Sequence, residues 1–520
     1  MLFEPDRRTF LAGVAAAAAA PFLPGRALAA EQGSIPAYRS ATDLAAALAD
    51  KKISSRELID AAIARIEALD PKINAVVVRD FDRARAAAKA ADEALAKGER
   101  KPLLGLPMTV KEQYRVAGLP TCWGHAKYKD WKPDTDSLVV QRLKSAGAVI
   151  LGKTNVPVDL SDWQSFNEVY GTTNNPWDFG RTPGGSSGGS AAALAAGFVP
   201  LELGSDIGGS LRAPAHFCGV YAHKTSLDIV PQRGIGFPET PANPVRGDMS
   251  VIGPMARSAA DLAFELEVIA GPDELWEGIG YKLALPAPRH DKLADYRVLV
   301  IDSNPLVPTA ESVRGALNAL ADRLAKSGCK LSRDTGKTPY LARTIRNYGE
   351  LLLAFFSRDL PPKDRAEVEA FARNLSPEDQ SLSAYRTRGI TIGHPEWIRA
   401  SSARSFLRAR WQELFRNEFD VVLCPCMPTP AWPHDHSMPE HDRKLDVDGK
   451  TVPYIDQIVW ASIATLTGLP ATAAPIAKSD TGLPIGVQII GGFHEDRTTI
   501  EFAELIEREY GGFTPPPNFV

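Results

Sequence analysis

The chain has little excess charge of either sign, no sequence repeat and no heptad pattern. Its 520 residues include 59 Lys and Arg and 63 Asp and Glu, so the net charge is −4, and the sequence contains no basic run. Proteins that bind nucleic acid usually carry a basic patch or stripe, so this composition predicts no nucleic-acid partner. A hydrophobic content of 44% in a chain of this length is enough for a large buried core.

Cysteine is scarce as well. The five cysteines, an odd number, stand at positions 122, 218, 329, 424 and 426 without the spacing of a disulfide framework. Only one residue separates Cys424 from Cys426, which is a poor geometry for a bridge between them. Cys and His residues also lack metal-site spacing, since His434 and His436 stand alone in a proline-rich loop. We therefore predict no required disulfide, no metal and no cofactor.

The sequence does contain two clusters of glycine and serine, residues 184–190 (GGSSGGS) and 204–210 (GSDIGGS). Such clusters are most often flexible linkers, but the stretch between them is alanine-rich and strongly helix-forming. Neither cluster fits the phosphate-binding loop, which needs a following Gly-Lys-Ser/Thr, or the dinucleotide fingerprint. Glycine permits turns whose successive N–H groups point into one concavity. We interpret the clusters as loops that hold a nucleophilic serine.

A serine nucleophile needs a neighbouring base. None of the nine histidines follows a Gly-x-Ser-x-Gly segment in the order expected for a nucleophile elbow. Lys111 instead ends the apolar run in GLPMTVKE. A lysine drawn into an apolar site has a lowered pKa and serves as a neutral base, although most lysines in such positions lie at the surface.

Three motifs together resemble those of the amidase signature family: Lys111 in GLPMTVKE, Ser186 in TPGGSSGGS and Ser210 in GSDIGGSLRAP. Their spacing along the chain is similar to that of the family, and the resemblance covers about residues 40–510. It implies one large α/β domain over residues 31–520, with a mixed central β-sheet covered by helices on both faces.

The resemblance also implies an amide hydrolase with a Ser-Ser-Lys triad. Ser210 would attack the amide carbonyl and form an acyl-enzyme. Ser186, which follows a cis peptide bond in the family, would relay the proton to Lys111 as the neutral base. The substrate would be a small-molecule amide with a linear, non-peptide C–N bond, cleaved to acid and ammonia or amine, with esters as a side activity. The implied oxyanion hole is made by four backbone N–H groups: those of Ile207, Gly208, Gly209 and Ser210.

Three residues near the triad receive a supporting interpretation. Ser187 either hydrogen-bonds within the triad or is a turn serine. Asp206 and Arg212 are expected to pair across the nucleophile loop and hold it rigid, in preference to contacting substrate. Downstream, the sequence departs from the family pattern at Tyr221 and His223, which we expect in the core rather than in a pocket.

The N-terminus predicts export. Arg7 and Arg8 form a twin arginine, followed by a mild apolar stretch and the small-x-small sequence ALA. We interpret residues 1–30 as a twin-arginine signal that the export machinery recognises and that is removed near Ala29 or Ala30, which places the enzyme in the periplasm. The apolar stretch is too short to cross about 30 Å of hydrocarbon, so we expect no stable membrane anchor.

Local patterns predict several helices and strands. A capping box at residues 54–57 (SSRE) predicts a helix, and a second one at 498–501 (TTIE) predicts the start of a C-terminal helix. A further helix is expected at about 311–326, and short apolar runs predict buried strands at 148–151, 298–301 and 421–423. The buried face of the first helix is expected to carry Leu58, Ala62, Ile66 and Leu69.

The sequence predicts neither the substrate nor the oligomeric state. The stretch at about 335–415 is helical in pattern and is expected to be a variable insert in the domain. Two other functions remain open. A glutaminase subunit of a tRNA-dependent amidotransferase shares the triad but works in the cytoplasm, and a non-catalytic binding protein on the same fold should have lost a triad residue. The aromatic residues of the insert shape an acyl pocket or belong to the ordinary core: Tyr340, Tyr348, Phe355, Phe356, Tyr385 and Trp397.

Overall fold

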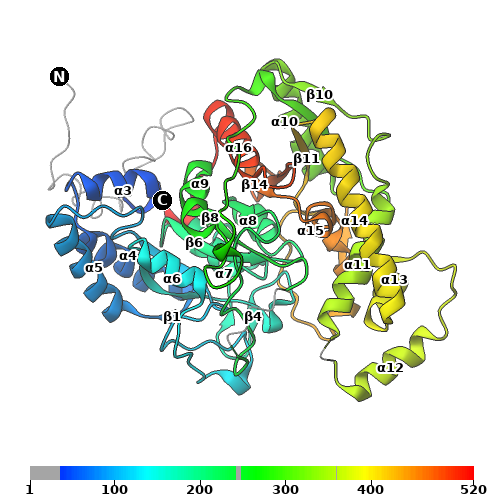
Figure 1. The fold of residues 1–520 in the computed structure, drawn as a ribbon, viewed down its shortest axis with the longest axis horizontal. Helices are drawn as coiled ribbons and strands as arrows, with labels where there is room; N and C mark the ends of the chain where they lie inside the picture. Colours follow the sequence, from blue (N-terminus) through cyan, green and yellow to red (C-terminus); the bar gives the residue numbers. More distant parts are fainter. Residues whose placement is uncertain (1–35, 242–246, 359) are drawn as a thin grey trace.

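The computed structural model describes residues 36–241, 247–358 and 360–520 (Figure 1). Its strands are β1 (Val76–Arg79), β2 (Pro107–Lys111), β3 (Val149–Thr154), β4 (Phe166–Asn167), β5 (Gly171–Thr172), β6 (Leu201–Asp206), β7 (Tyr221–Lys224), β8 (Val251–Ala256), β9 (Arg297–Val300), β10 (Lys330–Ser332), β11 (Val421–Pro425), β12 (Lys444–Val447), β13 (Lys450–Pro453), β14 (Ala471–Lys478) and β15 (Pro484–Ile490).

These strands are joined by helices α3 (Ala41–Ala49), α4 (Ser55–Leu69), α5 (Phe81–Ala96), α6 (Leu138–Ser145), α7 (Gly188–Ala195), α8 (Arg212–Cys218), α9 (Ala259–Ile269), α10 (Glu311–Lys326), α11 (Leu341–Phe356), α12 (Pro362–Ala372), α13 (Leu382–Ile390), α14 (His394–Asn417), α15 (Ser462–Thr467) and α16 (Asp496–Tyr510).

Eleven of the described strands form one sheet, in the order β1-β3-β2-β6-β8-β7-β14-β15-β11-β9-β10. The strand β2 pairs in parallel with β3 and β6, and β9 pairs in parallel with β10 and β11. The remaining neighbours in the sheet pair antiparallel. The prediction of a single large α/β domain with a mixed central sheet is therefore confirmed.

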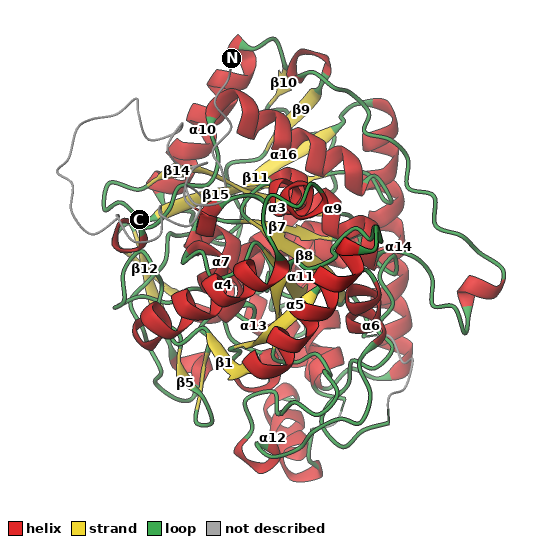
Figure 2. Cartoon of the chain, turned by 90° about the vertical axis from the view of Figure 1, so that its left-hand side faces the viewer, coloured by secondary structure: helices red, strands yellow, loops and turns green. Residues whose placement is uncertain are grey.

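Helices cover both faces of the sheet (Figure 2). Side chains alternate between the two faces of a strand, and β3 illustrates this. Ile150 packs in the apolar cluster that includes residues of α9 and α16, whereas its neighbours Val149 and Leu151 pack in the cluster that includes α4 and α7. Each face of the sheet is buried by its own layer of helices.

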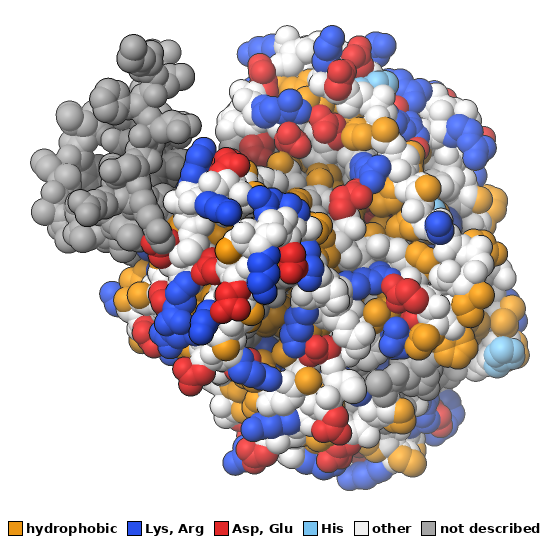
Figure 3. All heavy atoms as spheres, turned by 60° about the vertical axis from the view of Figure 1, so that its left-hand side comes forward, with side chains coloured by type: hydrophobic (Ala, Val, Ile, Leu, Met, Phe, Trp, Pro, Cys, Tyr) orange, Lys and Arg blue, Asp and Glu red, His pale blue; other side chains and the backbone are white. Residues whose placement is uncertain are grey.

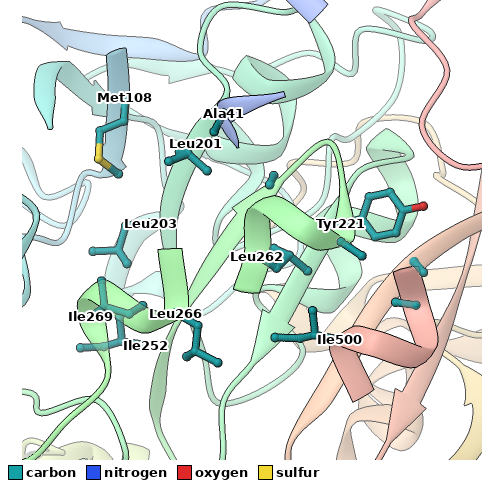
Figure 4. Packing of buried hydrophobic residues seen from close by; sticks show 14 of the residues in the cluster. Ala41, Met108, Leu201, Leu203, Tyr221, Ile252, Leu262, Leu266, Ile269 and Ile500 are labelled. Carbon is teal, nitrogen blue, oxygen red and sulfur yellow. The ribbon is translucent and has the colours of Figure 1, made fainter. Parts of the chain in front are cut away.

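The core on one of these faces is built from aliphatic side chains. In Figure 4, Met108 from β2, Leu203 from β6 and Ile252 from β8 surround the same space as Leu266 and Ile269 of α9. Burying a side chain of this size contributes about 1.5–3 kcal/mol relative to leaving it exposed. This layer fixes the strands β2 and β6, whose carboxyl ends carry the residues discussed below.

The stretch at 335–415 contains α11, α12, α13 and most of α14. In Figure 1, α11, α13 and α14 lie together on the right, away from α3 to α6 on the left. The helix α11 packs against α13, α14 and α15. Its Tyr348 is fully buried, whereas Tyr340 and Phe356 are 68% and 42% exposed, so the aromatic residues of this stretch do not share one environment.

The first capping box is confirmed. Ser54 is the N-cap of α4, its hydroxyl accepts from the Glu57 N–H, and the Glu57 carboxylate accepts from the Ser54 N–H at 2.9 Å. Leu58 and Ile66 are buried as expected, while Ala62 and Leu69 are only partly buried. The helix expected at 311–326 is α10, and the three expected strands overlap β3, β9 and β11.

The second capping box is wrong. The helix α16 begins at Asp496, so Thr498 and Thr499 lie inside its first turn, and the N-cap Glu495 makes no side-chain cap. The Thr498 hydroxyl accepts from the Arg289 N–H at 3.3 Å rather than from a helix N–H, and Thr499 Oγ1 donates to the Asp496 carbonyl at 2.9 Å. A threonine hydroxyl inside a helix is satisfied by bonds of this kind, so the Thr-x-x-Glu pattern does not require a cap.

The predicted export signal, with Arg7 and Arg8, lies outside the described residues. Among the helices that the structure describes, none is both long and apolar enough to cross a bilayer. Figure 3 shows Lys and Arg side chains interspersed with Asp and Glu over the visible face of the molecule. This mixture agrees with the nearly balanced charge of the chain.

Candidate active site

Lys111 is the last residue of β2, and its side chain is fully buried. Its Nζ lies 2.6 Å from Ser186 Oγ and 3.0 Å from Ser205 Oγ. Both partners are hydroxyls, which donate to a neutral amine or accept from an ammonium group. Burial lowers the pKa of Lys111 to about 7, although the negative charges of Asp206 and Glu202 act to raise it. A substantial fraction of this lysine is therefore neutral at pH 7.

The first glycine-serine cluster is packed too closely for side chains at its start. A Cβ on Gly184 would lie 2.6 Å from Pro214 Cα, and one on Gly185 would lie 2.2 Å from the Asp162 carbonyl oxygen. Glycine is therefore required at both positions. The peptide bond between Gly185 and Ser186 is cis, as the family resemblance implied, and Ser186 is 1% exposed.

The other partner of Lys111, Ser205, was not predicted from the sequence. Ser205 lies in β6, and its hydroxyl donates to Gln113 Oε1 at 2.8 Å. Gln113 is buried and stands two residues beyond Lys111. Ser205 belongs to the second glycine-serine cluster, but no local pattern separates it there from a turn serine. Its role depends on the pairing of β6 with β2, which brings it to Lys111.

The second cluster connects β6 to α8 and is held by a buried ion pair. The Asp206 carboxylate accepts from two Arg212 nitrogens, Nη2 at 2.8 Å and Nε at 3.0 Å. It also accepts from the backbone N–H groups of Gly209 at 2.9 Å and Leu211 at 3.1 Å. Burial acts to raise the pKa of Asp206, but the Arg212 charge and these hydrogen bonds bring it to about 2. The expected Asp206–Arg212 pair is therefore present and ionised.

Arg212 also ties the loop to the other half of the sheet. Its Nη1 donates to Gln488 Oε1 in β15 and, at 3.3 Å, to the Ala461 carbonyl. Its Nη2 donates to Thr465 Oγ1 in α15 at 2.8 Å. A guanidinium with all of these partners has little freedom to move. The geometry supports the structural role expected for this residue.

Ser210 lies where the two clusters meet. It is 6% exposed, more than Lys111 or Ser186, and its carbonyl accepts from the Ser187 N–H at 3.2 Å. Within the described chain, no hydrogen bond joins the hydroxyls of Ser186 and Ser210 directly. The structure thus connects Lys111 to Ser186 by side chains, and brings Ser210 to the same site through its backbone.

Comparison with known proteins identifies the family of the chain. A family model described as Amidase matches residues 57–500. A glutamyl-tRNA(Gln) amidotransferase subunit from Anaeromyxobacter sp. (strain K) is 33% identical over 503 residues, which cover 91% of this chain and 96% of that protein. The chain belongs to the amidase signature family.

Solved structures of related proteins have a similar fold. Native peptide amidase from Stenotrophomonas maltophilia is 26% identical, with a TM-score of 0.71 over 92% of this chain and 98% of that chain. A structure of a vestigial protein complex that reveals the origins of an s-triazine catabolic enzyme is 29% identical, with a TM-score of 0.74 over 90% of this chain and 98% of that one. The first of these two structures is named as an amidase, that is, an amide hydrolase.

The four amides expected to form the oxyanion hole of this amidase-family chain are not equivalent. The Gly209 N–H already donates to the Asp206 carboxylate at 2.9 Å. An N–H group bound to a charged acceptor inside the protein is not available to a ligand without breaking that bond. The amides of Ile207, Gly208 and Ser210 therefore remain as the candidates.

Ser187 fits the interpretation of a turn serine. Its hydroxyl donates to the Ser205 carbonyl at 3.4 Å and accepts from the Ser205 N–H at 3.5 Å. The prediction that Tyr221 and His223 lie in the core is confirmed, since both are fully buried in β7. His223 contacts Thr472 Oγ1 at 2.9 Å and an Asp496 carboxylate oxygen at 3.0 Å.

The remaining candidate ligands of this amidase-family chain are dispersed. His434 contacts Asn174 Oδ1 at 3.1 Å, and the His436 ring stacks on Phe166. Within residues 36–241, 247–358 and 360–520, no three His, Cys, Asp or Glu side chains are grouped as metal ligands would be. The cysteine thiols at 122, 218, 329, 424 and 426 are free and buried.

Proposed function

We propose that this member of the family hydrolyses a carboxylic acid amide through an acyl-enzyme on Ser210, with Ser186 and Lys111 moving the proton. One observation carries the proposal. The Lys111 amine is buried, has a pKa near 7 and contacts the hydroxyl of Ser186. The next residue, Ser187, donates its N–H to the Ser210 carbonyl. A neutral amine in such contact is suited to accept a proton from serine.

In the proposed reaction, Ser210 Oγ forms a bond to the amide carbonyl carbon. Its proton passes to Ser186 Oγ, which gives its own proton to Lys111 Nζ. When the tetrahedral intermediate collapses, the C–N bond breaks and the leaving nitrogen takes the proton back along the same route. General acid–base transfer of this kind typically contributes about 10²–10⁴-fold to the rate.

Water completes the cycle by the same route. It attacks the acyl carbon, its proton passes to Lys111, and the proton returns to Ser210 Oγ as the acid leaves. The Asp206–Arg212 pair holds the loop in place before substrate arrives, so the backbone N–H groups need little rearrangement to bind the developing oxyanion. An ester has a better leaving group than an amide and should be cleaved at the same site.

The surroundings of the loop support an apolar acyl group in the substrate. A Cβ on Gly208 would lie 3.4 Å from Ile458 Cδ1 and 3.8 Å from Tyr348 Oη, so these two side chains form the wall beside it. The side chain of Ile207 packs against the apolar cluster that contains Ile458 and Tyr348. Apolar walls with few polar groups are typical of sites for hydrophobic ligands.

A second candidate is a glutaminase subunit of a tRNA-dependent amidotransferase. The 33% identity to such a subunit from Anaeromyxobacter favours it. The proposed export signal argues against it, because that complex would work in the cytoplasm. Hydrolysis of glutamine in preference to apolar amides, together with a partner subunit that co-purifies, would support this candidate.

The test is turnover of a panel of fatty, aryl, peptidyl and simple aliphatic amides and glutamine. We expect Ser210→Ala to lower kcat by about 10⁴-fold or more. The matched control is Ser402→Ala, because Ser402 is an exposed serine on α14 that bonds the Ile398 carbonyl. Turnover that survives in Ser210→Ala would contradict the acyl-enzyme.

We also propose that the protein is exported to the periplasm by the twin-arginine route. The sequence around Arg7 and Arg8 supports this. In a bacterial host, the double variant Arg7→Lys, Arg8→Lys should stay in the cytoplasm with its signal uncleaved, while the parent is recovered from the periplasm. Equal distribution of the two proteins would contradict the proposal.

A further inference from the structure

The carbonyl groups of the nucleophile loop (residues 207–210) are fixed by donors from outside the loop. Tyr348 Oη donates to the Ile207 carbonyl at 2.7 Å. Trp163 Nε1 donates to the Gly208 carbonyl at 3.0 Å. Both side chains are buried. Two aromatic residues thus determine how two successive peptide planes of the loop are turned.

The next two carbonyls of the loop are bound by the backbone. The Gly209 carbonyl accepts from the Ala213 N–H at 2.7 Å, where α8 begins, and the Ser210 carbonyl accepts from the Ser187 N–H. In a trans peptide the C=O and the following N–H point in opposite directions. A donor that fixes one carbonyl therefore also fixes the direction of the next residue's N–H group.

This relation separates the amides of the loop. The bond from Tyr348 directs the Gly208 N–H away from α11, and the bond from Ala213 directs the Ser210 N–H away from the start of α8. The Gly209 N–H, whose direction Trp163 fixes, is bound by the Asp206 carboxylate. Gly209 has a φ of +94°, which turns the chain between the two other amides and which an L side chain rarely adopts.

We propose that the N–H groups of Gly208 and Ser210 take part in binding the oxyanion while that of Gly209 does not, and that Tyr348 is the positioning residue that orients the Gly208 N–H. This inference rests on the proposed function and assigns roles that the motifs alone do not. Tyr348 makes no hydrogen bond to a residue of the triad, and its hydroxyl acts on the Ile207–Gly208 peptide.

The hydrogen bond between Tyr348 and Ile207 joins segments that are distant in the sequence and that only the fold brings together. Tyr348 stands 141 residues after Ile207, on the helix α11 of the helical stretch. That helix packs against α15, which carries the Arg212 partner Thr465. The same wall of the site therefore lies beside the acyl group and holds one of the oxyanion donors.

Tyr348→Phe tests the inference, because it removes one hydroxyl and keeps the ring. We expect kcat for the best amide of the panel to fall about tenfold at unchanged KM, less than the 10²–10³-fold loss when an oxyanion donor is removed outright. The affinity for an aldehyde analogue of that substrate, whose adduct places an oxyanion in the hole, should fall by the same factor.

Tyr296→Phe is the matched control. Tyr296 is also fully buried, and its hydroxyl donates to a backbone carbonyl, that of His290, at 3.1 Å. It lies beside β9, away from the loop, and should leave kcat, KM and aldehyde affinity unchanged. If Tyr348→Phe behaves like this control, or raises KM at unchanged kcat, the inference is wrong.

Trp163→Phe tests the other half of the inference even if Tyr348→Phe does not fold. It frees the Gly208 carbonyl, but the N–H of that peptide belongs to Gly209 and stays bound to Asp206. We expect kcat to fall by about threefold at most. A tenfold or larger loss would show that the Gly209 amide serves the oxyanion and would overturn the assignment. A parent enzyme inactive on the whole panel would contradict the proposed function itself, and the inference with it.

Discussion

Two lysines on neighbouring strands allow a comparison within one sheet. Lys111 ends β2, and Lys153 lies in β3, which pairs with β2 in parallel. Both side chains are fully buried, and burial lowers the pKa of Lys111 to about 7 and that of Lys153 to about 8. Depth of burial alone therefore does not separate the proposed base from a structural lysine.

The two lysines differ in their partners. Lys153 Nζ donates to the Pro120 carbonyl at 2.6 Å and to Thr121 Oγ1 at 2.7 Å, and it lies 3.9 Å from a Glu112 carboxylate oxygen. The Thr121 hydroxyl gives its own proton to the Leu119 carbonyl at 3.4 Å, so all three groups act toward Lys153 as acceptors and favour its protonated form. Of the two hydroxyls that contact Lys111, that of Ser205 donates its proton to Gln113 Oε1, so only that of Ser186 is able to donate to a neutral Lys111. We infer that the chemistry of the partners, more than burial, marks the base.

Replacing each lysine by methionine tests this comparison most strongly. Lys111→Met removes the proposed base, and we expect kcat/KM for amides to fall by about 10²–10⁴-fold. Lys153→Met should leave kcat within about threefold of the parent, but lower the free energy of unfolding by about 3 kcal/mol, because Glu112 keeps a buried charge without its cation. Steady-state kinetics and urea unfolding measure the two effects.

Two outcomes would contradict this comparison of the lysines. If both variants lose activity equally while both stay folded, the partners of the two lysines do not determine which one is the base. If Lys153→Met is inactive and Lys111→Met is active, the comparison is reversed and the proposed triad is wrong.

Glu112→Gln sharpens the comparison from the side of the structural lysine. The two Glu112 oxygens accept from the backbone N–H groups of Cys122 at 2.6 Å and Trp123 at 3.0 Å. An amide in its place turns an NH₂ group toward one of these donors and leaves Lys153 without an anion. We expect unfolding to require about 3 kcal/mol less free energy. Glu99→Gln, at an exposed position, should change it by less than about 0.5 kcal/mol.

The sequence predicted the capping box of α4 and two residues of the candidate site. Ser54 and Glu57 cap α4 as expected, because a capping box acts over four residues and is visible in the local sequence. The motifs around Lys111 and Ser186 likewise pointed to residues that lie in contact. The capping box is short-range and needs no knowledge of the fold, whereas the contact between Lys111 and Ser186, 75 residues apart, was expected only from the resemblance of their motifs to those of the family.

The contacts that were missed join distant segments. Ser205 reaches Lys111 only because β6 pairs with β2, and Tyr348 reaches Ile207 only because α11 packs beside α15. No local pattern distinguishes these residues from an ordinary turn serine or core tyrosine. The capping box expected at Thr498 failed for a related reason, since the Thr498 hydroxyl accepts from the backbone N–H of the distant Arg289 at 3.3 Å.

The pH dependence of activity should report on Lys111. Only its neutral form accepts a proton, so kcat/KM should rise with pH and level off above a pKa near 7. Below that value it should fall about tenfold per pH unit. Lys153→Met should keep this acidic limb unchanged. A limb near the ordinary pKa of lysine would show that Lys111 is not desolvated in the working enzyme.

The smallest expected effect comes from a second pair of buried groups, Glu202 and Glu265. Burial raises the pKa of Glu202 to about 7, and Thr109 Oγ1 donates to its carboxyl at 2.5 Å. Burial also raises the pKa of Glu265 well above its ordinary value, and neither of its oxygens has a hydrogen-bond partner among the described residues. Near pH 7, Glu202 is therefore partly ionised.

Glu202→Gln should therefore move the acidic limb, and Glu265→Gln should not. The negative charge of Glu202 favours the ammonium form of Lys111, so its removal lowers the lysine pKa and brings the plateau of kcat/KM to a lower pH. The gain is greatest near pH 7, about twofold, because at lower pH Glu202 is already neutral in the parent. Glu265 is not one of the charges that act on Lys111, so Glu265→Gln should give the pH profile of the parent. A limb that moves to higher pH in Glu202→Gln, or equally in both variants, would mean that the charge on Glu202 does not act on the base.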